Sequence, residues 1–533
     1  MTRRAVGAGT IAEAFRLTVE DNADQIAVRT KDDEIAWTWS ELQARVDAFA
    51  GGLHALGLRR GDTLALMISN RPEFMIADLA ATMLGATPFS IYLTSSPEQV
   101  AYVIKDAGAR IAVVEEGFAP PVEHLITVPE MEAHYVEGFA PDWRAVEPDD
   151  VLTLIYTSGT TGPPKGVQLA HRNEMAAVDA VEKRVGFEDG SRVISWLPSA
   201  HVAERTAHHY LPIVYGMTIT TCPDPRRIGE YLPAVKPTWF FAVPRVWEKL
   251  KAGVEAKLDD AALSVIEASK QRVEAQAPFE DSPLFAGLRQ ALGLDQAKLV
   301  NVGAAPTPRE VFVFFHAIGI PLAEIWGMSE TCGAGASNPA ERIKIGTVGL
   351  PSPGVELKLA ADGELLVRSA VVMKGYRNLP SAIDEEGWFA TGDVATIDAD
   401  GYVTIVDRKK ELIINAAGKN MSPANIEAAL KGASPLIGQA CVIGDKRPYN
   451  TALLVLDPDY APAWVQRTGG DIHEAVQEAV ERANTALSRP EQIKRWTLLS
   501  EDWVPGGDEL TPTMKLKRRP IEEKFALEIN AMY

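Results

Sequence analysis

Residues 156–166 read Tyr-Thr-Ser-Gly-Thr-Thr-Gly-Pro-Pro-Lys-Gly, and this stretch is the most informative part of the chain. Its glycines allow backbone N–H groups to approach an anion, its hydroxyls supply donors or a metal ligand, and Lys165 adds a positive charge. The apolar run from Val151 to Tyr156 precedes it and predicts a buried strand. An isolated Ser/Thr/Gly cluster is more often a polar surface turn, but a cluster at the end of a strand predicts a polyphosphate-binding loop.

The loop differs from the Walker A motif of many nucleotide-binding proteins. That motif requires the pattern G-x-x-x-x-G-K-[ST] and opens directly into a helix. Here the glycine spacing is different, and Pro163 and Pro164 stand before the lysine. The loop therefore indicates another class of nucleotide-binding protein.

Length and charge restrict the function further. The chain has 533 residues, of which 46% are hydrophobic, and this length predicts two or more globular domains. Its 53 basic and 72 acidic residues give a net charge of -19. This charge argues against a nucleic-acid partner and against electrostatic docking on anionic lipid. An anionic nucleotide must therefore be bound by a few local positive side chains.

The cysteines and the N-terminus predict a cytoplasmic protein. Cys222, Cys332 and Cys441 are too few and too scattered for a disulfide framework or a zinc site. No apolar segment follows Arg3 and Arg4, so no export signal is predicted. No transmembrane segment is predicted either, and any membrane contact that a greasy substrate requires is expected to be peripheral. The sequence leaves the oligomeric state open.

The first third of the chain alternates strand-like and helix-like segments. The strand-like segments are 64–69, 87–92 and 110–114, and the helix-like segments are 72–84 and 97–107. A capping box at Thr38 and Glu41, and Ser96 before Pro97, mark helix starts. The alternation predicts an α/β fold whose large N-terminal domain has doubly wound, mostly parallel sheets with helices on both faces.

The pattern changes twice further along the chain. Residues 255–296 are charged and alanine-rich and predict mostly exposed helices. A strand-like run at 402–406 is followed by the charge cluster 407–411 and then by a short α+β segment. A charge cluster is usually a solvated turn, and at this position a joint between domains is the alternative. The sequence therefore predicts a large domain of residues 1–406 and a small α+β domain of residues 407–533.

Three further motifs contain side chains suited to a nucleotide. A strand-like run at 298–302 leads into Gly303-Ala304-Ala305-Pro306, whose small residues permit close approach of a flat ligand. Residues 326–331, Trp-Gly-Met-Ser-Glu-Thr, place an aromatic face for a purine near a carboxylate suited to Mg2+. In Thr391-Gly392-Asp393 the aspartate can accept hydrogen bonds from two ribose hydroxyls. Each motif alone is common in ordinary loops, so only their combination indicates a nucleotide site.

This ordered set of motifs resembles the adenylate-forming superfamily, which includes acyl-CoA synthetases, luciferases and the adenylation domains of peptide synthetases. The set consists of 156–166, the Gly303 turn, 326–331, 391–393, 407–411 and the tail Leu510-Thr511-Pro512-Thr513-Met514-Lys515. The resemblance covers nearly the whole chain, from Trp37 to Lys515. Residues 197–205, 243–247 and 411–420 are most similar to bacterial long-chain fatty acyl-CoA synthetases.

The resemblance implies an AMP-forming ligase that uses ATP, Mg2+ and coenzyme A to activate a long-chain fatty acid and transfer it to CoA. Catalysis would rest on Lys515, Thr160, Glu330 and His201, with Thr160 and Glu330 holding Mg2+. The implied ATP-binding residues are Thr157, Ser158, Gly159, Thr160, Thr161, Gly162, Lys165, Gly303, Ala304, Ala305, Trp326, Gly327, Met328, Ser329, Asp393 and Arg408. His201 and Trp247 would line the acyl site, Trp247 as an aromatic gate, and Lys410 would be the hinge between two catalytic orientations.

Two departures from the family pattern are visible. Thr513-Met514-Lys515 stands where the family often has Ser-Gly-Lys, and Ala416-Ala417 stands where many relatives carry a lysine that assists thioester formation. The sequence leaves three alternatives open: a ligase that loads a carrier protein, a ligase for a medium-chain or aryl acid, and a catalytically silent nucleotide-binding protein. It determines neither the acyl chain length nor the pathway.

Overall fold

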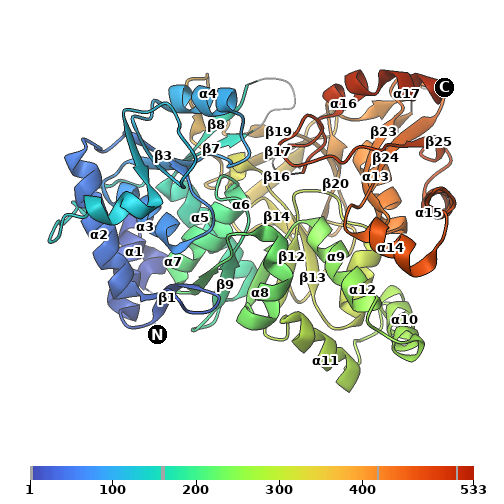
Figure 1. The fold of residues 1–533 in the computed structure, drawn as a ribbon, viewed down its shortest axis with the longest axis horizontal. Coiled ribbons are helices and arrows are strands. Elements are labelled where there is room, and N and C mark those ends of the chain that lie inside the picture. The colour runs from blue at the N-terminus through green and yellow to red at the C-terminus, as the bar shows by residue number, and fades with distance from the viewer. Residues whose placement is uncertain (1–3, 158–162, 417–418, 512–513) are drawn as a thin grey trace.

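The computed structural model of the protein describes residues 4–157, 163–416, 419–511 and 514–533. Figure 1 shows a large domain, coloured blue to yellow, and a smaller C-terminal domain, coloured orange to red, that lies against one side of it. No helix in these ranges is both long and apolar enough to cross a bilayer. The two-part organisation follows the hydrophobic clusters of the described residues, because two of them are formed by residues after 412 alone and the other four by residues up to 405 alone.

A parallel sheet near the N-terminus confirms the predicted alternation of strands and helices. Its strand order is β4-β3-β5-β6, with β3 (Thr63–Met67), β4 (Thr87–Ser90), β5 (Ile111–Val114) and β6 (His124–Thr127). α3 (Pro72–Met83) and α4 (Pro97–Ala107) connect the first three strands. β3, β4 and β5 are buried along their whole length, as expected for parallel strands that are covered on both faces.

The predicted helix starts are confirmed. At the start of α2 (Trp39–Ala55), the Glu41 backbone donates to Thr38 Oγ1 at 3.2 Å, and the Thr38 backbone donates to the Glu41 carboxylate at 2.8 Å. Ser96 and Gln99 form the same box at α4. α1 (Ile11–Asn22), which packs beside α2, is capped by Thr10. These caps satisfy N–H groups that the first turn of a helix leaves without partners.

Two sheets form the centre of the large domain. Their strand orders are β2-β1-β10-β9 and β11-β12-β13-β14-β15. The strands are β1 (Ile26–Thr30), β2 (Ala36–Thr38), β9 (Arg192–Ser195), β10 (Thr218–Thr221), β11 (Trp239–Ala242), β12 (Leu299–Val302), β13 (Leu322–Trp326), β14 (Ala336–Ser337) and β15 (Leu350–Pro351). Because β11, β12 and β13 are parallel, the segments that follow them leave the sheet at the same edge.

Helices surround these sheets. They are α5 (His171–Val185), α6 (Val202–Glu204), the π-helical turn η4 (Arg205–Tyr210), α7 (Leu211–Tyr215), α8 (Ile228–Val235), α9 (Pro244–Glu255), α10 (Asp260–Glu274), α11 (Pro283–Leu292) and α12 (Arg309–Ala317). Short 3-10 turns are η1 (Arg4–Gly7), η2 (Val128–His134), η3 (Trp143–Ala145), η5 (Pro225–Arg227) and η6 (Ser329–Thr331). α10 and α11 confirm the helices that were predicted between 255 and 296.

Antiparallel strands flank the predicted polyphosphate-binding loop and form the end of the large domain. The loop connects β7 (Val151–Thr157) to β8 (Lys165–Ala170) in a hairpin, and β18 (Gly375–Tyr376) pairs with β8. A second sheet contains β16 (Val355–Leu359), β17 (Glu364–Ser369), β19 (Phe389–Ile397) and β20 (Val403–Arg408). The predicted domain boundary between residues 406 and 407 falls inside β20, because Arg408 still pairs with Asp393.

The small domain has an α+β arrangement. Its strands are β21 (Ile413–Ile414), β22 (Asn420–Met421), β23 (Ile437–Ile443), β24 (Asn450–Leu456) and β25 (Ile493–Leu498). Its helices are α13 (Pro423–Ala433), α14 (Tyr460–Thr468), α15 (Ile472–Ala486), α16 (Arg518–Lys524) and α17 (Ala526–Ala531). The largest of its sheets has the order β23-β24-β25 and packs on α13 and α15 through buried residues such as Ile426, Leu454 and Val476.

Candidate active site

A cavity of about 1630 Å³ lies between the two domains. It is bordered by the ends of β7, β11 and β13, by β19 and β20, and by the C-terminal tail. The sequence-predicted residues that line it are Thr157, Lys165, His201, Ala304, Ala305, Trp326, Gly327, Met328, Ser329, Glu330, Asp393, Arg408, Lys410 and Lys515. Ser158, Gly159, Thr160, Thr161 and Gly162 lie outside the described residues. Segments that are far apart in the sequence therefore meet around one cavity.

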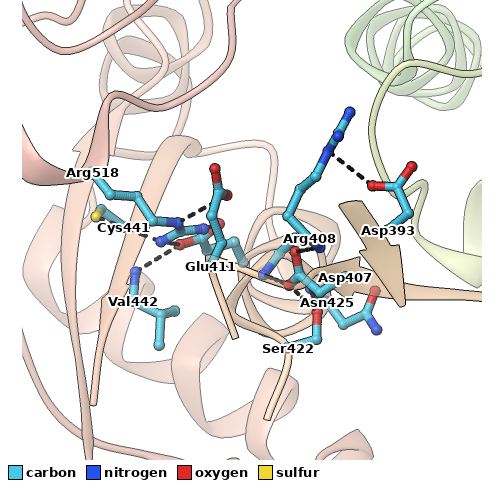
Figure 2. Close-up of polar contacts among 11 residues, drawn as sticks. Asp393, Asp407, Arg408, Glu411, Ser422, Asn425, Cys441, Val442 and Arg518 are labelled. Carbon is cyan, nitrogen blue, oxygen red and sulfur yellow. Dashed lines mark hydrogen bonds and ion pairs between the residues drawn. The ribbon is translucent and has the colours of Figure 1, made fainter. Parts of the chain in front are cut away.

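Trp326, Asp393 and Arg408 form a polar corner of this cavity. Asp393 is buried; its Oδ2 accepts a hydrogen bond from the Trp326 indole at 2.8 Å, and its Oδ1 is 2.8 Å from Arg408 Nε. Figure 2 shows Arg408 extending toward Asp393 from the neighbouring strand. Burial raises the pKa of Asp393, although Arg408 acts in the opposite direction. The corner presents an aromatic ring, a fixed carboxylate and a guanidinium to a ligand.

The Gly303 turn comes close to this corner but Gly303 itself does not border the cavity. A Cβ at Gly303 would lie 3.1 Å from the Ile325 side chain and 3.3 Å from the Phe241 ring, so the turn packs tightly on its neighbours. The next residue, Ala304, lines the cavity and has a φ of 73°, which is unusual for a residue other than glycine. The turn thus places the small side chains of Ala304 and Ala305 at the cavity wall.

Glu330 and Lys165 also border the cavity. Glu330 is buried, and Tyr376 Oη donates a hydrogen bond to its Oε1 at 2.7 Å. Lys165 Nζ lies 5.1 Å from the centre of the Tyr376 ring. No group of three or more His, Cys, Asp or Glu side chains that could hold a metal is present in the described part of the chain. One buried carboxylate fits Mg2+, because this ion binds one or two carboxylates together with substrate phosphates.

Lys515 reaches the cavity from the C-terminal tail. Its backbone is held by Thr511, which accepts from the Lys515 N–H at 3.0 Å through Oγ1 and donates to the Lys515 carbonyl at 2.8 Å. Lys515 is exposed to the cavity rather than enclosed by protein; desolvation by the surrounding walls and the charge of Arg408 lower its pKa, while Asp393 and Glu330 act to raise it. The turn before it contains Met514 with a φ of 65°, a conformation that glycine adopts more easily. This geometry accounts for the glycine that the family often has at this position.

His201 begins α6 and borders the cavity. Its Nδ1 accepts a hydrogen bond from the Ala203 backbone at 3.1 Å, so the neutral ring carries its proton on Nε2. Burial, together with the charge of Lys515, lowers the pKa of His201 to about 4. His201 is therefore neutral at physiological pH and suited to donating a hydrogen bond to an oxyanion rather than to acting as a strong base.

Trp247, the expected aromatic gate, does not border the cavity. Its side chain is 0% exposed and packs edge-on against Phe240 and Phe315, with ring centres 5.6 and 4.9 Å away. The alternation of β11 explains this placement, because Phe240 points toward Trp247 while Trp239 and Phe241 point to the opposite face. Trp239 and Phe241 line the cavity, and they form its apolar wall with Val181, Val202, Ala207 and Ile325.

Glu324 also borders the cavity, although the sequence analysis did not single it out. It pairs with Val302 across β12 and β13, which sets it beside the Gly303 turn. Burial raises the pKa of Glu324 to about 7. Its position two residues before Trp326 was the available signal, because residues two apart on a strand share a face.

Polar contacts surround Lys410 on both sides, and Figure 2 shows the one between Glu411 and Arg518. Before it, Lys409 Nζ binds Asp362 at 2.5 Å and Glu364 at 2.8 Å, both in the large domain. After it, Glu411 lies 3.4 Å from Arg518 in the small domain. Lys410 therefore stands between one residue that is anchored to the large domain and one that is anchored to the small domain.

Comparison with known protein families agrees with this geometry. A profile described as "AMP-binding enzyme" matches residues 15–377, and one described as "AMP-binding enzyme C-terminal domain" matches residues 410–533. The chain belongs to the AMP-binding enzyme family. Together the two matches cover both domains of the structure and leave between them only the segment that contains β19 and β20.

Relatives and solved structures extend the comparison. The "putative fatty-acid--CoA ligase fadD11" of Mycobacterium tuberculosis is 48% identical over 74% of this chain and 76% of its own length. The "long-chain-fatty-acid--CoA ligase FadD15" of Mycobacterium bovis is 34% identical over 93% of this chain and 92% of its own. The o-succinylbenzoate CoA synthetase of Bacillus subtilis, solved with its acyl-adenylate, is 23% identical with a TM-score of 0.75 over 96% of this chain and 97% of its own, which shows the fold.

Arg518 has a structural role in the tail of this AMP-binding enzyme, three residues after Lys515. It forms two hydrogen bonds, at 2.7 and 2.8 Å, with the carboxylate of Glu427, which is 5% exposed. The Val442 backbone donates to the same carboxylate at 2.8 Å, and Figure 2 shows this cluster beside Glu411. The tail that carries Lys515 is thus attached to α13 of the small domain.

We predict that Arg518→Met destabilises the small domain by about 3 to 5 kcal/mol, because it leaves Glu427 buried and unpaired. The effect is measured by heating the protein and using proteolysis of the small domain as the readout of its unfolding. The control is the double variant Arg518→Met/Glu427→Gln, which removes the unpaired charge and is expected to recover most of the loss. Equal stability of the single and double variants would contradict the assigned ion pair.

Glu174 of α5 provides a pH-dependent contribution to stability. Its side chain is fully buried, and Thr206 Oγ1 donates to its Oε1 at 2.5 Å behind the cavity wall. Burial raises the pKa of Glu174 to about 7, against the lowering effect of the Thr206 hydrogen bond. A raised pKa in the folded state means that this contribution is fully present below the unfolded pKa and is lost as the pH rises through the folded pKa.

We predict that the free energy of unfolding of Glu174→Gln, measured relative to that of wild type, is larger at pH 8 than at pH 5. The shift corresponds to about 3 kcal/mol across this pH range, since one pKa unit is about 1.4 kcal/mol. Thermal unfolding of both proteins at several pH values measures the difference, in which groups common to both cancel. Parallel pH profiles of stability for the two proteins would show that the pKa of Glu174 is the same in the folded and unfolded states, and would contradict the prediction.

Proposed function

We propose that the protein is an AMP-forming acyl-CoA ligase that acts on long-chain fatty acids. It would convert the acid and ATP to acyl-AMP and pyrophosphate, and then transfer the acyl group to the thiol of CoA. The observation that carries this proposal is the single cavity in which Lys515 of the tail meets the Trp326, Asp393 and Arg408 corner and an apolar wall. Membership of the family and the names of the curated relatives support it.

The first half-reaction requires neutralisation of charge on the α-phosphate and on the departing pyrophosphate. We assign Lys515 to the oxygens of the carboxylate and the α-phosphate, and His201 to the same oxygens as a neutral donor through Nε2. Lys165 and the loop that begins at Thr157 would bind the β- and γ-phosphates. Glu330 would hold Mg2+ with Thr160, and the bound ion would neutralise charge on the phosphates.

The nucleoside would lie in the polar corner. We assign adenine to the space between Trp326 and the small residues Ala304 and Ala305, and the ribose hydroxyls to Asp393 and Arg408. The indole that donates to Asp393 fixes the orientation of this carboxylate before the ribose arrives. Such preorganisation reduces the entropy that binding must overcome.

The acyl chain would extend along the apolar wall that contains Trp239 and Phe241. These side chains replace Trp247 in the proposal, because they border the cavity and Trp247 does not. The wall suits a hydrocarbon chain, which gains free energy by leaving water. After acyl-AMP forms, rotation of the small domain about Lys410 would withdraw Lys515 and admit CoA.

An ATP- and CoA-dependent assay over a series of acids, from acetate through very long chains to aryl acids, tests the proposal. We expect acid-dependent pyrophosphate exchange with long-chain acids, followed by thioester formation with CoA. Turnover of aryl acids without turnover of any medium- or long-chain acid would replace the substrate class. Acyl-AMP formation without transfer to CoA would favour a carrier-protein acceptor, and the absence of exchange with every acid would indicate a silent nucleotide-binding protein.

A further inference from the structure

The small domain contacts the large domain at a second place besides the hinge. Asp457 follows β24, and its carboxylate forms an ion pair with the guanidinium of Arg245 on α9. Asp459 binds Lys249, four residues further along α9, at 2.7 Å. Figure 1 shows α14, which starts just after these aspartates, beside α9. Two acidic residues of the small domain therefore face two basic residues of one helix of the large domain.

The two pairs differ in their surroundings. The Asp457 side chain is 5% exposed and that of Arg245 is 26% exposed, whereas Lys249 and Asp459 are 53% and 76% exposed. Exposed ion pairs contribute little because water and salt screen them, while buried pairs are screened much less. Of these two ion pairs, Arg245–Asp457 is therefore the one that can bias the position of the small domain.

Both partners of this pair are already ordered. Asp457 Oδ1 accepts hydrogen bonds from the Asp459 and Tyr460 backbones at 3.0 and 2.8 Å, so its carboxylate is fixed at the start of α14. Glu248 holds the other side of the Arg245 guanidinium at 2.9 Å. Little side-chain entropy remains to be lost when the domains meet, which makes the pair a specific docking contact.

Arg245 also connects the docking contact to the cavity. It lines the same cavity as Lys515, and it immediately follows Pro244 at the start of α9, just beyond the end of β11. A hinge at Lys410 alone leaves the small domain free to rotate, whereas a second contact on α9 defines one orientation. In the orientation of this structure, Lys515 faces the cavity.

We propose that Arg245 is a positioning residue for acyl-AMP formation: its ion pair with Asp457 holds the small domain in the orientation that places Lys515 in the cavity, and the pair separates before CoA is acylated. This role rests on the proposed function. A contact that forms in only one of two domain orientations stabilises that orientation, and its free energy sets how far the ratio of the two populations shifts. Loss of the pair therefore favours the orientation for thioester formation without changing the groups that perform either step.

Asp457→Asn tests this role, because asparagine keeps the Oδ1 acceptor for the two backbone N–H groups and removes the charge. We measure acid-dependent pyrophosphate exchange and transfer of the acyl group from preformed acyl-AMP to CoA. The rate ratio of transfer to exchange is expected to rise by about tenfold, which corresponds to about 1.4 kcal/mol.

Glu274→Gln is the matched control, because Glu274 pairs with Arg309 on the surface of the large domain and faces no part of the cavity. It is expected to leave the ratio unchanged. If Asp457→Asn lowers the rates of pyrophosphate exchange and of acyl transfer by the same factor, the pair has a merely structural role and the proposal is overturned. An unchanged ratio would overturn it as well.

A second measurement does not depend on activity. Spin labels on Val265→Cys in α10 and Leu527→Cys in α17, which are 46% and 83% exposed, report the distance between the domains. The native cysteines are buried. We expect one dominant distance in the otherwise unchanged protein and a second population with Asp457→Asn. An identical distribution of spin-label distances in both proteins would overturn the positioning role, even if the enzyme acts on a different acid. A lack of pyrophosphate exchange in wild type would overturn only the proposed function.

Discussion

Lys515→Ala is expected to slow acyl-AMP formation by about a hundredfold or more, because removal of one charge-stabilising donor typically costs about 2.7 to 4 kcal/mol of transition-state stabilisation. The ammonium group faces Asp393 and Glu330 across the cavity, where it can reach the oxygens between which the new bond forms. Transfer of the acyl group from preformed acyl-AMP to CoA should change little, because the proposed rotation of the small domain would by then have moved Lys515 away.

Acid-dependent pyrophosphate exchange and single-turnover transfer measure the two steps separately. The matched control is Arg519→Ala, which removes a neighbouring positive charge that is exposed and paired only with Glu523. It should leave both rates close to wild type. A similar loss with both variants would mean that the basic tail acts through its overall charge, and an unimpaired Lys515→Ala would remove the catalytic assignment.

Lys410→Pro is expected to preserve acyl-AMP formation and to slow thioester formation strongly. Proline fixes φ near -65°, and rotation of the small domain requires the backbone to change at one position between the two anchored segments. Lys409 is held by Asp362 and Glu364 of the large domain, and Glu411 is held by Arg518 of the small domain. Lys410 is therefore the residue at which the change in φ and ψ can take place.

The control for this prediction is Lys410→Ala, which removes the side chain but leaves the backbone free to rotate. It should support both half-reactions. Equal losses of both steps with Lys410→Pro would count against the hinge, because they would point to a disrupted turn at 409–411 instead. Spin-label distances between the domains, collected with and without CoA, would show directly whether the proline variant remains in one orientation.

Much of the fold was predictable because it depends on short-range patterns. α4 begins and ends where its proline and its apolar spacing indicate, and the capping boxes at Thr38 and Ser96 are present. The parallel pairing of β3, β4 and β5 followed from their alternation with helices. The domain boundary was less predictable, because β20 continues for two residues beyond the boundary predicted at residue 406.

The site was only partly predictable. Trp326, Asp393 and Lys515 lie at one cavity, as their motifs suggested, but the hydrogen bond between Trp326 and Asp393 joins residues 67 positions apart and has no local signature. Trp247 was expected at the acyl site because an aromatic residue stands there in similar sequences. Its actual neighbours, Phe240 and Phe315, are set by the packing of α9 on the sheet.

The sequence by itself determined the type of chemistry, because the predicted phosphate loop, the predicted nucleoside motifs and the tail with its lysine are each a short run of particular residues. Such runs can be recognised without knowledge of the fold. The tertiary structure alone decided which aromatic side chains border the cavity, how far burial shifts the pKa values of His201 and Glu324, and how Arg245 meets Asp457 across 212 residues of sequence. The physical reason is that burial and ion pairing depend on distances between elements that are remote in the chain, whereas motifs depend on neighbours along it.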